Sequence, residues 1–295
     1  MTACLADVID PAFEVISPDE TTAPFLFNSP HSGRIYPRAF VEQSRLAFPT
    51  LRRSEDTFVD ELFLDAVKAG APLMRALFPR SFLDLNREPY ELDPRMFDGR
   101  LPPFANTRSI RVSGGLGTIA RVVGDAQEIY PRRLTVAEGL DRIEAYYKPY
   151  HHALRRLVGR IQRSFGVAVL VDCHSMPSSS ARDDLARADC VIGDRYGTSC
   201  SEVVTATIEA GLSARGYRVV RNKPYAGGYI TEHYGNPAAG LHAVQIELNR
   251  GLYMDEARYE RHGGFERVRA DMAALVPELF AAVADQLAAP RAAAE

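Results

Sequence analysis

Two histidines follow short apolar runs of the kind that form buried strands. The run FLF at 25–27 ends shortly before His31, and the run VLV at 169–171 ends shortly before His174. Open α/β sheets bind ligands beyond the carboxyl ends of their strands, so we expect both imidazoles at one edge of a sheet. Two histidines and one carboxylate can hold zinc and leave a position open for a catalytic water. A lone hydrogen-bonded loop histidine is the alternative for either residue, but two histidines in parallel contexts favour a metal site.

Carboxylates at two places could complete this chemistry. Glu55 and Asp56 precede an expected helix, and both are candidates for the third metal ligand. Glu247 follows the apolar run 243–246, where an acid is costly unless it is paired or functional. There it could take a proton from an attacking water and pass it to the leaving amine. The structural alternative for Glu247 is a buried ion pair with Arg250 or another arginine.

Arginines could hold the negative charge of a substrate. We expect a strand at 81–83 that leads into the word DLNR at 84–87. The planar guanidinium of Arg87, beside Asn86, matches the two oxygens of a substrate carboxylate. Arg80 could stabilise the oxyanion that forms at the scissile carbonyl. A surface ion pair is the alternative for either arginine alone.

These residues must be positioned by an alternation of short apolar runs and amphipathic stretches, which predicts an α/β sheet covered by helices. The expected strands are 25–27, 72–78, 167–171, 190–192, 218–220 and 242–248. The expected helices, with apolar residues at three- and four-residue spacing, are 57–69, 135–165, 199–215 and 263–287.

The remaining segments predict one domain over 1–295 with a single irregular region. The stretch 88–135 is rich in Pro, Gly and Arg, and we expect a partly ordered insertion near the site. The first 20 or so residues should be weakly held, and the Ala-rich end 288–295 should be a flexible tail.

Composition limits the class of protein. The chain has 295 residues, of which 46% are hydrophobic, so it can bury a large core. Its net charge is only −3, and the basic residues are dispersed, which argues against nucleic acid as a partner. The four cysteines form no CxxC pair, and there is no leader-like or membrane-spanning apolar stretch. We therefore expect a cytoplasmic protein with reduced cysteines and no membrane association.

The ordered motifs resemble the N-formylglutamate amidohydrolase (N-formylglutamate deformylase) family from about Phe25 to Tyr253. The words that carry the resemblance are NSPHSG, VDELF after an acid, DLNR, GLGTIARV, YYKPYH, LVDCHS, GGYITEHYG and AVQIELN. DLNR, DCHS and the closing IEL also resemble the aspartoacylase and zinc carboxypeptidase clan. The resemblance implies a phosphorylase/hydrolase-like three-layer α/β/α sandwich with a mixed sheet, one zinc ion and a glutamate general base.

Carried onto this sequence, the resemblance implies a role for each of ten residues. It places the zinc ion on His31, Asp56 and His174, with Asp56 preferred to Glu55 as the acid before the VDELF helix. It makes Glu247 the catalytic base and Arg80 the partner of the amide carbonyl. The substrate-binding residues would be Asn86, Arg87, Tyr229, His233 and Arg250.

The implied reaction releases formate and glutamate from N-formyl-L-glutamate, a small-molecule substrate whose hydrolysis resembles the end of histidine breakdown. Other N-acyl amino acids or small peptides, as for a carboxypeptidase-like peptidase, remain open, as does the oligomeric state. In the carboxypeptidase pattern an acid follows the first histidine by three residues, whereas Arg34 stands at that position here. The third ligand must therefore come from elsewhere in the chain.

Three other functions have weaker support in the sequence. The stretch 115–120 fits GxGxxA, but Gly124 and Pro131 follow it, leaving too little helix to bind a dinucleotide pyrophosphate. We expect a glycine loop close to the active site instead. No GxSxG elbow supports a serine hydrolase. A non-catalytic small-molecule or peptide-binding protein on the same scaffold is the remaining alternative, and the joint presence of the ligands, the base and DLNR argues against it.

Overall fold

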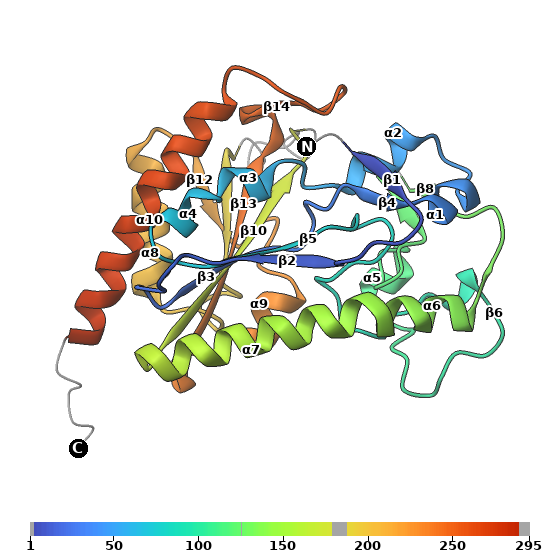
Figure 1. The fold of residues 1–295 in the computed structure, drawn as a ribbon, viewed down its shortest axis with the longest axis horizontal. Helices are drawn as coiled ribbons and strands as arrows, with labels where there is room; N and C mark the ends of the chain where they lie inside the picture. Colours follow the sequence, from blue (N-terminus) through green and yellow to red (C-terminus); the bar gives the residue numbers. More distant parts are fainter. Residues whose placement is uncertain (1–2, 125, 179–187, 289–295) are drawn as a thin grey trace. The chain divides into compact units, whose positions relative to one another are not determined.

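The computed structural model describes residues 3–124, 126–178 and 188–288 (Figure 1). Its contacts divide the described residues into two compact units. The first unit consists of the described residues within Met1–Val15, Ser29–Phe58 and Met74–Leu157. The second unit consists of the described residues within Ile16–Asn28, Val59–Leu73 and Val158–Glu295. The single domain over 1–295 stays a prediction beside this division.

A seven-stranded mixed sheet forms the core of the fold. Its strand order is β12-β11-β13-β10-β3-β5-β2. In chain order these strands are β2 (Phe13–Ile16), β3 (Phe25–Ser29), β5 (Leu73–Ala76), β10 (Ala168–Met176), β11 (Cys190–Gly193), β12 (Val219–Arg221) and β13 (Leu241–Asn249). β10 is parallel to β3 and β13, whereas β11 is antiparallel to β13 and parallel to β12. All six strands expected from the apolar runs are present.

Three expectations about strands are wrong. The segment 81–83 is a turn, because the amides of Phe82 and Leu83 both donate to the carbonyl of Pro79. β10 does not end at Val171 but runs on to Met176, because β13 continues beside it in register. The first 20 residues are not weakly held throughout: β2 is an edge strand of the sheet, and β1 (Cys4–Ala6) pairs with β4 (Ile35–Pro37).

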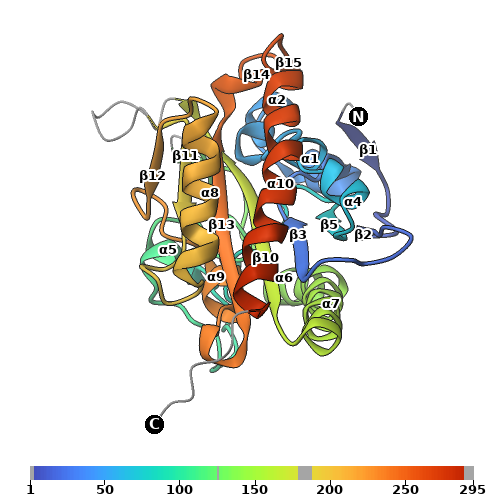
Figure 2. The ribbon, with the colours of Figure 1, turned by 90° about the vertical axis from the view of Figure 1, so that its left-hand side faces the viewer.

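Helices cover both faces of the strands in the second unit, which confirms the predicted α/β layers. Figure 2 shows α8 (Glu202–Ala214) and α10 (Phe265–Ala288) side by side on one face, and these two helices are in contact. The C-terminal half of α7 (Lys148–Phe165) and α9 (Tyr229–Tyr234) lie on the other face. α10 buries the predicted apolar stripe Val268, Met272, Leu275 and Leu279.

The expected helix 135–165 is continuous but not uniform. It consists of α6 (Val136–Arg142), a π-helical turn at Ile143–Tyr147, and α7. α6 begins with a capping box, in which the Thr135 hydroxyl accepts from the amide of Glu138 and the Glu138 carboxylate accepts from the amide of Thr135. The expected helix 57–69 instead forms two short helices, α3 (Val59–Leu62) and α4 (Asp65–Lys68).

The other elements are short. In the first unit they are α1 (Arg38–Gln43), α2 (Phe48–Leu51), α5 (Ile110–Ser113), β6 (Phe97–Asp98), β7 (Val122–Val123), β8 (Gln127–Glu128) and β9 (Leu134–Thr135). In the second unit, β14 (Met254–Asp255) pairs with β15 (Glu260–Arg261). Ala288 is the last residue of α10, and the rest of the expected tail lies outside the described residues. Among the described helices, none combines the length and apolar character required to cross a bilayer.

Candidate functional site

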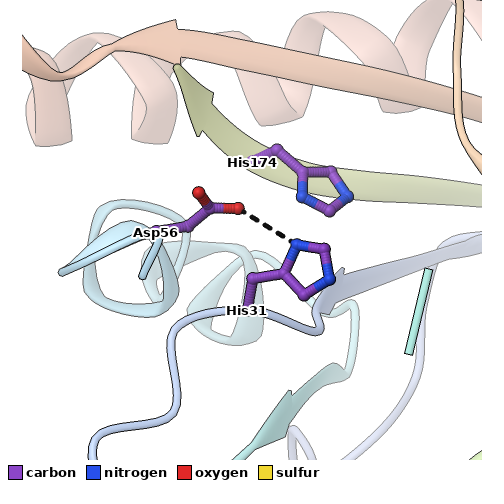
Figure 3. Close-up of side chains that lie close together, drawn as sticks. All are labelled: His31, Asp56 and His174. Carbon is purple, nitrogen blue, oxygen red and sulfur yellow. Dashed lines mark ion pairs between the residues drawn. The ribbon is translucent and has the colours of Figure 1, made fainter. Parts of the chain in front are cut away.

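Three side chains that could share one metal ion come together in the structure. His31 lies in the turn after β3, Asp56 in the loop before α3, and His174 within β10. One potential ligand atom of each residue lies within 4.8 Å of the other two, and all three side chains are buried (Figure 3). Two imidazoles and a carboxylate form the donor set of many catalytic zinc sites. The residue types and their proximity therefore fit a bound metal ion.

Hydrogen bonds between two loops fix His31 beside Asp56. The amide of Asp56 donates to the carbonyl of His31 at 3.0 Å, and the hydroxyl of Ser32 donates to the carbonyl of Asp56 at 3.0 Å. The Nδ1 atom of His31 then lies 3.4 Å from Oδ2 of Asp56. Gly33 is required here because a Cβ atom at this position would lie 2.0 Å from the carbonyl oxygen of Phe78. The NSPHSG motif thus positions the candidate ligand His31, and its glycine leaves room for the backbone at Phe78.

The structure distinguishes the two candidates for the acidic ligand. Glu55 accepts hydrogen bonds from Tyr36 Oη at 2.6 Å and from Nε and a terminal nitrogen of Arg52, both at 3.0 Å. Thr57 donates to the same carboxylate at 2.9 Å. Burial, together with the charge of Glu55, raises the pKa of Tyr36 well above its usual value, so this contact stays a phenol–carboxylate hydrogen bond. These partners hold Glu55 away from the two histidines, whereas Asp56 lies in the group with His31 and His174.

A carboxylate supports each candidate imidazole ligand. Nε2 of His31 lies 2.7 Å from Oδ1 of Asp84, and Nε2 of His174 lies 2.8 Å from Oδ2 of Asp172. The second oxygen of Asp172 accepts from Nδ2 of Asn28 at 2.7 Å. Metal-binding histidines usually donate their other ring N–H to such a partner, which fixes the tautomer and the orientation of the ring. If both histidines bind a metal ion, these contacts favour Nδ1 of each ring as the ligand atom.

Asp84 and Asp172 are not among the site residues predicted from the sequence. A signal for Asp172 was present, because residues two apart on a strand share a face and Asp172 stands two before His174. Asp84 is 53 residues away from His31, and no local pattern joins them. Burial by itself would raise the pKa of Asp84, but the guanidinium groups of Arg80 and Arg87, together with His31, hold it well below its usual range. Asp84 is therefore an anion that can support a neutral or cationic imidazole.

The DLNR segment is held by contacts with two distant parts of the first unit. The amide of Asp84 donates to the carbonyl of Thr118 at 2.8 Å, which ties the segment to the glycine loop. From α7, Nε2 of His151 lies 2.9 Å from the carbonyl oxygen of Leu85. Tyr147, in the π-helical turn, donates its hydroxyl hydrogen to the carbonyl of Arg87 at 2.6 Å. Residues of the GLGTIARV and YYKPYH motifs therefore hold the DLNR segment in place.

The two candidate arginines differ in their surroundings. Arg80 donates Nε to Asp84 at 3.0 Å, and 28% of its side chain is exposed. Arg87 is 11% exposed and donates to the carbonyls of Leu116 at 2.8 Å and Asn86 at 2.7 Å. Burial lowers the pKa of Arg87 to about 10, so it remains a cation at neutral pH. Arg80 is the more accessible to a substrate, whereas much of the guanidinium of Arg87 already binds the backbone.

The proposed base lies beside one of the candidate ligands. Glu247 in β13 is the register partner of His174 in β10, and its side chain is buried. Its carboxylate accepts a hydrogen bond from Nε2 of Gln245 at 2.8 Å. The Oε1 atom of Gln245 in turn accepts from the amide of Gly228 at 2.9 Å. This places a buried acid beside His174 and links it, through Gln245, to the backbone of Gly228.

The other expected substrate-binding residues lie in the second unit. Tyr229 begins α9, and its ring stacks on that of the exposed His233 one turn later, with 4.9 Å between ring centroids. Arg250 is buried and donates Nε to the hydroxyl of Ser175 at 3.0 Å. Ser175 directly follows His174 on β10. The roles of these three residues in substrate binding stay predictions.

The mixed α/β sheet and its buried His/Asp/His group are compatible with a metal-dependent hydrolase, and comparison with known proteins shows that the class is an amidohydrolase. The family model for N-formylglutamate amidohydrolase matches residues 23–254. An N-formylglutamate deformylase of Pseudomonas putida is 30% identical over 252 residues, covering 82% of this chain and 86% of that protein. The Pseudomonas aeruginosa protein of the same name is 29% identical over 251 residues, with the same coverage.

A solved structure agrees with these relatives. The crystal structure of N-formylglutamate amidohydrolase from Ralstonia eutropha JMP134 superposes with a TM-score of 0.89 at 35% identity, covering 93% of this chain and 99% of that one. The chain belongs to the N-formylglutamate amidohydrolase family, as the sequence motifs predicted.

Proposed function

We propose that this enzyme hydrolyses N-formyl-L-glutamate to formate and L-glutamate, with one zinc ion held by His31, Asp56 and His174. The observation that carries the proposal is the buried group formed by these three side chains, with a carboxylate behind each imidazole. The substrate is suggested by the names of the Pseudomonas deformylases and of the Ralstonia amidohydrolase.

Zinc, when bound, would lower the pKa of a water molecule and polarise the formyl carbonyl. Glu247 would take the proton from the attacking water and return it to the amide nitrogen as the carbon–nitrogen bond breaks. Its register position beside His174 supports this role. Arg80, the more exposed arginine, would stabilise the negative charge that develops on the carbonyl oxygen.

Asn86 and Arg87 would bind the α-carboxylate of the substrate and so fix the formyl carbon in place. The contacts of Arg87 with backbone carbonyls mean that it would offer only part of its guanidinium to the substrate. Tyr229, His233 and Arg250 would line the approach to the site. Aromatic and cationic side chains there suit a small, charged acyl amino acid.

Formate release from N-formyl-L-glutamate tests the proposal directly. The purified protein should release formate, lose this activity after chelation, and regain it when zinc is added back, with elemental analysis giving one zinc per chain. His174→Ala should abolish zinc binding and activity. His152→Ala, which changes an exposed histidine of α7, is the matched control and should retain both.

Formate release that is unaffected by complete metal removal would refute the role of the metal. Stoichiometric zinc binding without hydrolysis of N-formyl-L-glutamate would refute the substrate.

A further inference from the structure

Two consecutive residues after β11 adopt a left-handed backbone conformation. The φ angles of Arg195 and Tyr196 are 53° and 58°, in a region that residues with a Cβ atom rarely occupy. Such conformations persist only where the surroundings impose them, and they cluster at active sites, ligand clamps and switch regions. The loop therefore holds the backbone of Arg195 in a fixed conformation.

A buried pair of polar side chains imposes this conformation. Oδ1 of Asp194 accepts from Nδ2 of Asn222 at 2.8 Å and from the amide of Gly197 at 3.0 Å. Oδ1 of Asn222 accepts from the amides of Asp194 and Tyr196 at 3.2 and 3.3 Å. Both side chains are buried. These hydrogen bonds join the two side chains to each other and to amides of the loop backbone. None of them involves the guanidinium of Arg195, so the loop is held without neutralising the charge of this arginine.

Contacts connect Arg195 to the proposed base. A Cβ atom built on Gly227 would lie 3.3 Å from Cδ of Arg195, so the arginine side chain packs over this glycine. The amide of the next residue, Gly228, donates to Gln245, and Gln245 donates to the carboxylate of Glu247. All of these residues belong to the second unit. Arg195 thus lies over the Gly227–Gly228 segment, here called the glycine turn. The Gly228 amide contacts Gln245, which supports the proposed base Glu247.

The charge of Arg195 is held by a partner that a ligand could replace. A terminal nitrogen of Arg195 lies 2.9 Å from Oε2 of Glu232, and the two side chains are 33% and 58% exposed. Exposed ion pairs contribute little net stability, so exchanging one carboxylate for another at this guanidinium has a small cost. Glu232 therefore occupies the place that the carboxylate of a ligand could take.

We propose that Arg195 binds the side-chain carboxylate of the substrate and makes the enzyme selective for N-acyl derivatives of dicarboxylic amino acids. The inference rests on the proposed function. N-formyl-L-glutamate carries two carboxylates, and the Asn86 and Arg87 pair accounts for only one of them. A guanidinium held in a fixed position at the glycine turn supplies the second, charge-matched contact.

The test compares N-formyl-L-glutamate with N-formyl-L-glutamine, which has nearly the same shape but a neutral side chain. Wild-type enzyme should prefer the glutamate substrate. Arg195→Gln should lower kcat/KM for this substrate by about 10- to 100-fold, mainly through KM, and so remove most of the preference. Glu232→Gln removes the competing carboxylate and should lower KM for the glutamate substrate. Arg258→Gln, at an exposed arginine, is the matched control and should change neither parameter.

Each other outcome counts against one of the two proposals. If wild-type enzyme is active but does not distinguish the two substrates, or if Arg195→Gln retains the preference, Arg195 does not bind the side-chain carboxylate. An equal loss on both substrates would assign Arg195 a role only in loop structure, as would a gross change in the circular dichroism of the variant. If the wild type hydrolyses neither substrate, the proposed function itself fails, and the assignment of Arg195 fails with it.

Discussion

Replacing Asp172 with asparagine tests whether a buried carboxylate supports the proposed zinc site through His174. The side chain of Asp172 is fully buried, and each of its oxygens has a hydrogen-bond partner, Nε2 of His174 at 2.8 Å and Nδ2 of Asn28 at 2.7 Å. Loss of such a support costs about 10- to 100-fold in metal affinity, or roughly 1.4 to 2.7 kcal/mol. We expect Asp172→Asn to weaken zinc binding by this amount.

The same substitution also creates a packing problem that must be separated from the loss of charge. An asparagine amide at position 172 would direct its NH₂ group toward a donor on either His174 or Asn28. One buried donor would then lack an acceptor, which should lower the free energy of unfolding of the metal-free protein by about 1 to 3 kcal/mol. The double variant Asp172→Asn/Asn28→Asp restores an acceptor for every donor, because the new carboxylate at position 28 can accept from the new amide. It should recover stability but not zinc affinity, because no carboxylate contacts the imidazole.

Zinc affinity can be measured by competition with a chromophoric chelator, and stability by urea unfolding of the metal-free variants. Wild-type zinc affinity in Asp172→Asn would refute the proposed role of the carboxylate. Full recovery of affinity in the double variant would show that hydrogen-bond complementarity, and not the negative charge, supports His174.

Three further predictions concern the base, the ligand loop and acid stability. Glu247→Gln should bind zinc normally and lower kcat for formate release by at least about 100-fold, and near-normal turnover would contradict its role as base. Gly33→Ala should lower the free energy of unfolding by roughly 1 to 3 kcal/mol and weaken zinc binding, because its Cβ would meet a backbone oxygen. Gly263→Ala, where a Cβ meets no atom within 4 Å, is its control. The hydrogen bond from Arg132 lowers the pKa of Glu138 from 4.5 to about 2. The stability that the ionised Glu138 carboxylate contributes is therefore present above pH 4.5 and is lost as the pH falls toward 2. Urea unfolding of metal-free Glu138→Gln should therefore show a weaker decline over that interval, and an unchanged decline would contradict this coupling.

Local sequence was enough to predict the strands at the centre of the sheet and the longest helices. Apolar runs such as 169–171 and 243–246 have few alternatives to burial, and the stripe that includes Val268 and Met272 has the period of a helix. Motifs placed His31 and His174 correctly as residues that come together. These features depend on the types of residues close together in the chain, which the sequence states directly.

Packing in the folded chain gives two adjacent acids different surroundings. Glu55 and Asp56 differ by one position, and only the family resemblance, not the local pattern of residue types, favoured Asp56. The fold brings Tyr36 to the carboxylate of Glu55, where Arg52 also binds, and turns Asp56 toward His31. The partners of a carboxylate come from distant parts of the chain, so its role depends on packing and not on its neighbours in sequence.

The supports of the site were likewise decided by long-range contacts. Asp84 reaches His31 across 53 residues, and the register of β10 and β13 sets His174 beside Glu247. The segment 81–83, expected as a strand, is a turn because the amides of Phe82 and Leu83 donate to the carbonyl of Pro79. Residue types and motifs along the chain identify the side chains that could bind a metal or move a proton. Their mutual geometry was decided by backbone pairing and burial, because distances between residues far apart in the chain exist only once the chain has folded.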